Sequence, residues 1–218
     1  MDFAIGTLLP IGIAVAALLI SLTVHEFSHA LVAYLQGDET AYQAGRLTLN
    51  PIAHIDPMGT IFLPGLLLIA GSPVMFGWAK PVPFNPLNLR NVRTGPLLVG
   101  LAGPLSNILM CVVFAIALKF ALGVYDPSNY LILFFANLMV MNFVLGVFNL
   151  IPIPPLDGSR ILTTLLPNHL MYIADFLEQY GNYIIIFLLI INATVYPFFG
   201  IFLEKGIGLI TQVLDIPL

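Results

Sequence analysis

The sequence contains few charged residues. Only 8% of its 218 residues are Asp, Glu, Lys or Arg, whereas 59% are hydrophobic. Soluble globular domains contain roughly 25% charged residues, so this composition argues against a water-soluble domain and indicates a protein that lies in a lipid bilayer. The net charge is only −4 and no cluster of Lys and Arg is present. We therefore expect no nucleic acid partner.

Cysteine is almost absent. Cys111 is the only one, which excludes an internal disulfide and a cysteine zinc cluster, and we expect it to be a small packing residue. The opening residues 1–3 lack the positive charge that begins a secretory signal, so the first apolar segment is expected to be a retained membrane helix. Repeats, low-complexity segments and long linkers are also missing. We expect residues 1–218 to form a single membrane-embedded domain.

Long apolar runs predict an all-α polytopic membrane protein with about four to six transmembrane helices. A helix needs about 20 apolar residues to cross a bilayer. Four runs meet this requirement, at 3–35, 94–122, 130–150 and 183–203.

The segments between these runs are less regular. The run 58–78 is apolar but interrupted by Pro and Gly, so it is predicted either to re-enter the membrane or to span it. The strand/loop segment 36–57 includes a weak alternation at 41–49 that predicts a short strand or β-hairpin, with a turn at Gly45. The loop 151–182 includes an amphipathic stretch, 171–180, that is expected at the membrane interface.

The distribution of basic residues favours the re-entrant path. The loops 36–57, 77–94 and 151–182 contain Lys and Arg, whereas the loop 123–129 contains none. If 58–78 re-enters, the three basic loops lie on one face, which the positive-inside rule makes cytoplasmic. If 58–78 spans, the basic loops are split between the two faces. We expect the re-entrant arrangement.

The strongest motif is HEFSH at residues 25–29. His25 and His29 lie one helical turn apart on the same face, so both imidazoles can reach one metal ion. Glu26 is placed to take a proton from the attacking water. The alternative is an ordinary polar patch, but ionisable groups at the end of a membrane helix are costly and usually functional.

Two histidines do not complete a catalytic zinc site, which usually has three protein ligands. The candidates for the third are His54, Asp56, Asp157 and His169. Asp157 is favoured because it follows a proline-rich stretch and precedes Gly158, so a rigid, non-helical backbone presents its carboxylate. Taken alone, Asp157 would be better interpreted as a helix cap or turn residue. The role of His54 stays open: it could contact the metal, orient a ligand or cap the next segment.

At these motifs the sequence resembles the site-2 proteases, the intramembrane zinc metalloproteases of peptidase family M50. The resemblance rests on HEFSHA at 25–30, AGPLSN at 102–107 and NLIPIPPLDGSR at 149–160. NPIAHIDPMGT at 50–60 and FGWAKPVPFNP at 76–86 resemble a bacterial branch of the family. Gly103, Pro104 and Asn107 also match, and we interpret them as helix packing beside the site.

The resemblance implies a role for each matching residue. His25, His29 and Asp157 would bind one zinc ion per chain, Glu26 would be the general base, and Asn149 would hold the substrate or the developing oxyanion. The implied function is zinc-dependent endopeptidase cleavage of membrane-spanning protein substrates in a bacterial cell membrane, with the active site toward the cytoplasm. The alternative is a non-proteolytic membrane metal-binding protein, either a transporter or an inactive scaffold. The sequence does not predict the oligomeric state.

Overall fold

The computed structural model describes residues 2–69 and 77–216, and all regular elements in this part of the chain are helical. This agrees with the predicted all-α class. Four described helices are long and apolar enough to cross a membrane: Leu8–Leu35, Gly95–Leu122, Tyr130–Asn149 and Asn168–Thr194.

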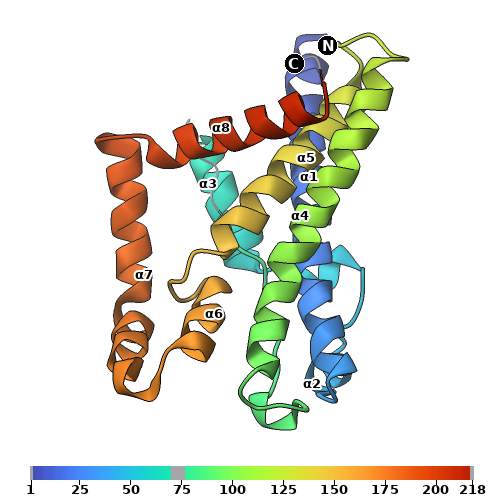
Figure 1. Ribbon diagram of the computed structural model, residues 1–218. Coiled ribbons are helices and arrows are strands. Elements are labelled where there is room, and N and C mark those ends of the chain that lie inside the picture. The colour runs from blue at the N-terminus through green and yellow to red at the C-terminus, as the bar shows by residue number, and fades with distance from the viewer. Residues whose placement is uncertain (1, 70–76, 217–218) are drawn as a thin grey trace.

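Three long helices form the centre of the fold (Figure 1). They are α1 (Asp2–Leu35), α4 (Gly95–Leu122) and α5 (Tyr130–Asn149), and each packs against the other two. Their bounds agree closely with three of the predicted helices. These helices form because long runs of Leu, Ile, Val, Ala and Phe carry no charge that would oppose burial in lipid.

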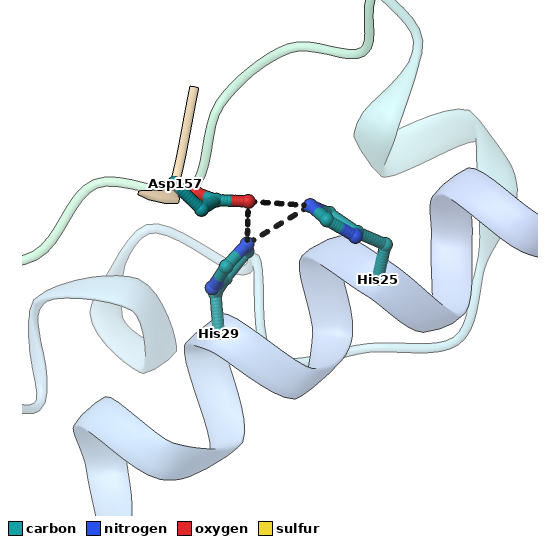
Figure 2. Close-up of side chains that lie close together, drawn as sticks. All are labelled: His25, His29 and Asp157. Atoms are coloured by element: carbon teal, nitrogen blue, oxygen red, sulfur yellow. Dashed lines mark hydrogen bonds and ion pairs between the residues drawn. The ribbon is translucent and has the colours of Figure 1, made fainter. Parts of the chain in front are cut away.

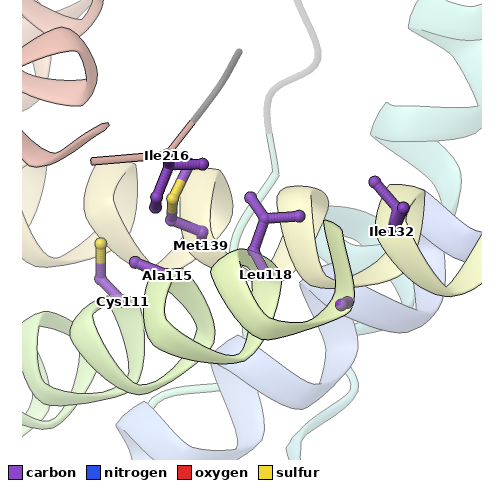
Figure 3. Close-up of a cluster of buried hydrophobic side chains, with 7 residues drawn as sticks. Cys111, Ala115, Leu118, Ile132, Met139 and Ile216 are labelled. Atoms are coloured by element: carbon purple, nitrogen blue, oxygen red, sulfur yellow. The ribbon is translucent and has the colours of Figure 1, made fainter. Parts of the chain in front are cut away.

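A cluster of buried apolar side chains joins α4 and α5 to the C-terminal end of the chain (Figure 3). Cys111 and Leu118 of α4 lie against Met139 and Ile132 of α5, and Ile216 completes the cluster. Cys111 is only 2% exposed, as expected for a small packing residue. This cluster holds α4 and α5 together. None of its residues belongs to the HEFSH motif of α1.

The end of α1 is fixed by a glycine and a buried carboxylate. Gly37 has a φ of +100° and Asp38 N–H donates to the Ala33 carbonyl at 3.0 Å, which together end the helix in the left-handed conformation that glycine favours. The carboxylate of the fully buried Asp38 accepts hydrogen bonds from Asn85 N–H at 2.7 Å and Asn88 Nδ2 at 3.0 Å. The segments that follow α1 and precede α4 are thereby joined.

The predicted strand or β-hairpin at 41–49 is wrong. The structure has a short helix there, α2 (Thr40–Gln43), followed by a turn at Gly45, whose φ is +68°. The helix forms because Asp38 accepts hydrogen bonds from the N–H and the hydroxyl of Thr40, and Gly45 then reverses the chain, so that Arg46 N–H bonds to the Ala41 carbonyl. These local hydrogen bonds between a side chain and the backbone override the weak alternation of the sequence.

The region 58–78 begins as a π-helical segment, Pro57–Phe62, and continues as α3 (Leu63–Ile69). Residues 70–76, with the predicted Gly71-Ser72-Pro73 break, lie outside the described residues. At the far end, Trp78 N–H donates to the Gly59 carbonyl at 3.2 Å. The two ends of the region therefore lie side by side, while its path relative to a membrane stays a prediction.

The predicted helix 183–203 and the interfacial stretch 171–180 are wrong in their bounds. A continuous helix, α7 (Met171–Thr194), includes both the amphipathic stretch and most of the apolar run, and α8 (Phe198–Val213) follows it. The chain breaks between them at Pro197, which lacks an N–H for a helical hydrogen bond. Gly181 lies inside α7. An added Cβ there would be 2.2 Å from the Pro154 carbonyl oxygen, so the glycine lets α7 pack closely against the backbone at Pro154.

Candidate metal centre

The two histidines of the HEFSH motif lie on one buried face of α1. His25 and His29 are 5% and 8% exposed, and their Nε2 atoms are 3.0 Å apart. One turn of helix separates the two residues, so their side chains project from neighbouring positions on the same face. Figure 2 shows the two rings turned toward a common point.

Asp157 reaches the same point from a different part of the chain (Figure 2). Its Oδ2 atom lies 3.1 Å from His25 Nε2 and 3.3 Å from His29 Nε2. It directly precedes a helix, α6 (Gly158–Leu165), but its side chain makes no capping hydrogen bond. Asp157 therefore occupies the N-cap position of α6, as the alternative interpretation expected, but its carboxylate does not cap the helix. Part of the predicted loop 151–182 is helical, because α6 begins at Gly158.

Gly158 allows the backbone to present Asp157. A Cβ added at residue 158 would lie 2.3 Å from the Leu150 carbonyl oxygen and 2.5 Å from that of Ile151. Only glycine fits so close to the backbone that leaves α5. The Asp-Gly pair thus turns the chain back against the end of α5, with the carboxylate facing α1.

Hydrogen bonds fix the orientation of both imidazole rings. His25 Nδ1 lies 2.5 Å from Asn107 Oδ1, and His29 Nδ1 lies 2.6 Å from the Val99 carbonyl oxygen. Both oxygens are acceptors, so each Nδ1 carries the proton and donates it. The two Nε2 atoms then present lone pairs, which is the state in which histidine binds a metal.

The three convergent atoms fit a divalent metal. Oδ2 of Asp157 is buried and has no hydrogen-bond partner, and it faces two nitrogen lone pairs, an arrangement that is unfavourable without a cation. Bonds of roughly 2.0–2.1 Å to a tetrahedral zinc place neighbouring ligand atoms about 3.3 Å apart, close to the observed 3.0, 3.1 and 3.3 Å.

A buried polar network extends from His25 into the helix bundle. Asn107 Nδ2 donates to Asn142 Oδ1 at 2.8 Å, and Asn142 Nδ2 donates to Ser21 Oγ at 2.8 Å. All three of these side chains are fully buried. The amide nitrogen of Asn107 donates to Asn142, so the amide oxygen is the atom that faces His25. This arrangement fixes both the orientation of the amide and the tautomer of the histidine.

Gly103 of α4 packs directly against the imidazole rings of His25 and His29. A Cβ added there would lie 2.4 Å from His29 Nε2 and 2.7 Å from His25 Nε2. The absence of a side chain lets α4 approach α1 at the site. The sequence-based interpretation of Gly103 as helix packing beside the site agrees with this contact, whereas Asn107 also bonds to His25 Nδ1. Asn142 and Ser21 were not predicted; the only available signal was the presence of polar residues inside apolar runs.

Glu26 lies beside the three converging residues but outside their cluster. Its Oε2 atom accepts a hydrogen bond of 2.9 Å from Val82 N–H, which belongs to the loop before α4. The carboxylate is thus held by backbone rather than by the imidazoles. A general base must not itself be a metal ligand, and the separation of Glu26 from the three converging residues meets this requirement.

The model of peptidase family M50 matches residues 13–131 and 125–192 of the chain. The chain belongs to this family. Putative zinc metalloprotease YwhC of Bacillus subtilis is 43% identical over 172 residues, which cover 77% of this chain and 75% of the relative. Putative zinc metalloprotease Rip2 of Mycolicibacterium smegmatis is 32% identical over 184 residues, or 83% and 68% of the two chains. No solved structure matches the chain. The predicted resemblance to the site-2 proteases is confirmed.

The other candidates for a third ligand in this family member lie elsewhere. Asp56 caps the segment that follows it by accepting from Met58 N–H and Gly59 N–H. His169 is exposed. His54 is buried and bonds to Thr48 and Arg46. Among the described residues, only His25, His29 and Asp157 form a group of possible metal ligands.

Asn149 is the last residue of α5, eight positions before Asp157. Its Nδ2 donates to the Leu145 carbonyl of its own helix at 3.0 Å. An amide nitrogen carries two hydrogens, so a second donor remains on the same atom. The role that the resemblance implies for Asn149 stays a prediction.

Proposed function

We propose that the protein is a zinc-dependent endopeptidase that cleaves membrane-spanning segments of protein substrates. The observation that carries the proposal is the convergence of His25, His29 and Asp157 at buried positions between helices that are apolar enough to cross a membrane. A soluble substrate would have no direct route to metal ligands that lie on a membrane helix. A substrate that itself lies in the membrane can approach laterally.

Each residue of the site has a defined task in this proposal. His25, His29 and Asp157 bind one zinc ion, and Asn107 and Val99 hold the two imidazoles in the required tautomer. When bound there, zinc supplies Lewis-acid chemistry, which polarises a scissile carbonyl and lowers the pKa of a coordinated water to about 7.

Glu26 is the general base. It takes a proton from the attacking water and passes it to the nitrogen of the leaving amine. The N–H of Val82 binds one carboxylate oxygen at 2.9 Å, so the other oxygen remains to accept the proton. The second N–H of Asn149 donates to the substrate carbonyl as negative charge develops on it.

The substrate segment must unwind before it is cut. In a helix each carbonyl accepts a hydrogen bond from the N–H four residues later, which hinders attack. Gly and Pro destabilise a helix interior by roughly 1 and 3 kcal/mol relative to Ala, so they favour local opening. We therefore expect helix-weakening residues near the cleaved bond.

The proposed topology places the site toward the cytoplasm of a bacterial cell. Contacts between the three basic loops support a shared face: Arg90 N–H donates to the Gln36 carbonyl at 2.9 Å, and the Arg160 guanidinium lies 4.5 Å from the centre of the Phe84 ring. The return of Trp78 to Gly59 is the arrangement that a re-entrant 58–78 segment needs. The positive-inside rule then assigns the shared face to the cytoplasm.

The test uses a tagged reporter with one Leu/Ala membrane span that carries a central Gly-Pro pair. Wild-type protein and reporter are reconstituted together in nanodiscs, and cleavage is followed before and after zinc is removed and restored. We expect cleavage that depends on zinc and is lost in Glu26→Gln. Zinc binding without any cleavage of this reporter, or of single-span proteins co-expressed with the protein, would favour the metal-binding scaffold instead.

A further inference from the structure

A buried pair of basic side chains lies beside Glu26 and outside the metal centre. Arg46 is 6% exposed and His54 is 2% exposed. Neither belongs to a candidate membrane span or to the group of possible metal ligands. Burial of an arginine is costly unless its charge and donors are used, so its position between α2 and the loop before α4 requires an explanation.

Hydrogen bonds fix the orientation of the His54 and Arg46 side chains. His54 lies with Nε2 at 2.8 Å from the Thr48 carbonyl oxygen, so Nε2 carries the proton and donates it. Nδ1 then presents a lone pair to the guanidinium Nη2 of Arg46 at 3.4 Å. A neutral His54 thus orients Arg46 rather than repelling it.

The Arg46–His54 pair holds the backbone of Lys80 on both sides. Nη2 of Arg46 donates to the Lys80 carbonyl oxygen, and Lys80 N–H donates to the His54 carbonyl oxygen at 3.0 Å. Both backbone hydrogen-bonding groups of one loop residue are therefore bound by the pair. The position of this part of the loop depends on Arg46 and His54.

Two residues farther along, the same loop holds Glu26. Val82 N–H donates to Glu26 Oε2 at 2.9 Å. Val82 is flanked by Pro81 and Pro83, which lack N–H groups and restrict φ to about −65°. The segment from Lys80 to Val82 is consequently stiff. Between the two prolines, Val82 supplies the backbone N–H that bonds to the carboxylate of Glu26.

The charges of Arg46 and Glu26 also interact. Burial lowers the pKa of the Arg46 guanidinium, and the negative charge of Glu26 opposes this change. The Nε atom of Arg46 is buried without a hydrogen-bond partner. A loop fastened only for stability would be served by a neutral donor, whereas a cation close to Glu26 attracts the carboxylate as well as the loop.

We propose that Arg46, oriented by His54, is a positioning residue for the general base Glu26. It acts through Lys80 and Val82, whose backbone it places against the Glu26 carboxylate. The inference rests on the proposed function in that Glu26 is taken to be the base. The hydrogen-bonded path itself can be tested without any cleavage.

The first experiment measures hydrogen–deuterium exchange of the amides at Lys80 and Val82 in purified full-length protein in nanodiscs. Arg46→Gln is expected to raise exchange at both by about tenfold or more, because the loop loses the donor that holds it. Arg46→Lys restores one N–H donor to the Lys80 carbonyl and is expected to give an intermediate rate. His54→Phe is expected to resemble Arg46→Gln, and His54→Gln to be milder because its amide can donate and accept.

The second experiment measures cleavage of the Gly-Pro reporter by the same variants. Arg46→Gln is expected to lower kcat about ten- to a hundredfold, the range for a misplaced catalytic group, with KM and bound zinc unchanged. The matched controls are Arg93→Gln and His169→Gln, which alter exposed residues of the same types. Both are expected to behave as wild type in exchange and in cleavage.

Three results would overturn the inference. Wild-type exchange in Arg46→Gln would show that Arg46 does not hold the loop. Faster exchange with an unchanged kcat would show that the loop does not position the base. Loss of zinc together with kcat would assign Arg46 to the metal site. By contrast, wild-type cleavage in Glu26→Gln, or no cleavage by wild type, would contradict the proposed function, and the exchange measurement would still decide whether the pair holds the loop.

Discussion

The amide oxygen of Asn107 lies 2.5 Å from Nδ1 of His25, so a side chain of α4 determines the tautomer of a histidine of the candidate metal centre on α1. Asn107 is in turn held by Asn142 of α5. The three central helices thus contribute to the orientation of one imidazole. The metal centre is a property of the bundle rather than of the HEFSH motif alone.

We expect Asn107→Leu to weaken zinc binding about ten- to a hundredfold, the usual effect of removing a group that orients a metal ligand. The change removes the acceptor of His25 Nδ1 and the donor to Asn142 Oδ1. Zinc affinity is measured by competition with a chelator. Asn137→Leu is the control, because Asn137 bonds only to the Leu133 carbonyl of its own helix. Equal affinities in the two variants would contradict an orienting role.

Gly103→Ala is expected to lose most of its bound zinc. The added methyl group would overlap the Nε2 atoms of His25 and His29, and neither ring can move away without leaving the metal. The control is Gly12→Ala, where an added Cβ meets no atom within 4 Å. Zinc per chain, measured by elemental analysis, should fall in the first variant only. Retention of a full zinc complement in Gly103→Ala would show that α4 does not confine the rings.

Asp38→Asn is expected to lower the free energy of unfolding by about 1–3 kcal/mol at pH 7, because a buried carboxylate that accepts several hydrogen bonds is replaced by an amide. Burial raises the pKa of Asp38, but hydrogen bonds from Thr40, Asn88 and Asn85 lower it below its ordinary value of 3.8. A lowered pKa stabilises the fold above the ordinary value, and this stability is lost as the pH falls through the folded-state value.

The measurement for Asp38 is thermal unfolding in detergent between pH 7 and pH 3. The difference between wild type and Asp38→Asn is expected to be constant at neutral pH and to shrink below the ordinary pKa of the carboxyl. A difference that grows on acidification would contradict this account of Asp38.

The topology predicts which loops can be labelled from each side of the membrane. In a Cys111→Ala background, cysteines at the exposed positions Ile52, Val92 and Leu165, one in each basic loop, are expected to react with an impermeant maleimide from the cytoplasmic side. A cysteine at the exposed Val124 is expected to react only from the opposite side. If Ile52 and Val92, which flank the segment 58–78, react from different sides, the basic loops do not share a face and the re-entrant path of 58–78 is wrong.

The features predictable from sequence are those fixed by local composition and spacing. Uncharged runs of sufficient length located α1, α4 and α5, and the one-turn spacing placed His25 and His29 on one face. The proline-rich approach and Gly158 distinguished Asp157 from three other candidates, because together they describe a rigid turn. Each of these signals lies within one continuous stretch of sequence.

The features that were missed depend on contacts between distant segments. The weak alternation at 41–49 suggested a strand, but the Asp38 side chain starts a helix there. The helix 183–203 was placed too late because hydropathy does not reveal that α7 extends back to Met171. The partners of Asn107 and the association of Arg46 with Lys80 join residues that are more than 30 positions apart, which no local pattern encodes.

In the proposed enzyme three residues bind the metal, while a fourth takes the proton from water. Zinc per chain and reporter cleavage are therefore measured together in Asp157→Asn and Glu26→Gln. We expect about one zinc per chain in the wild type, loss of zinc and cleavage in Asp157→Asn, and full zinc with no cleavage in Glu26→Gln. Full zinc in Asp157→Asn, or cleavage by Glu26→Gln at the wild-type rate, would contradict the account.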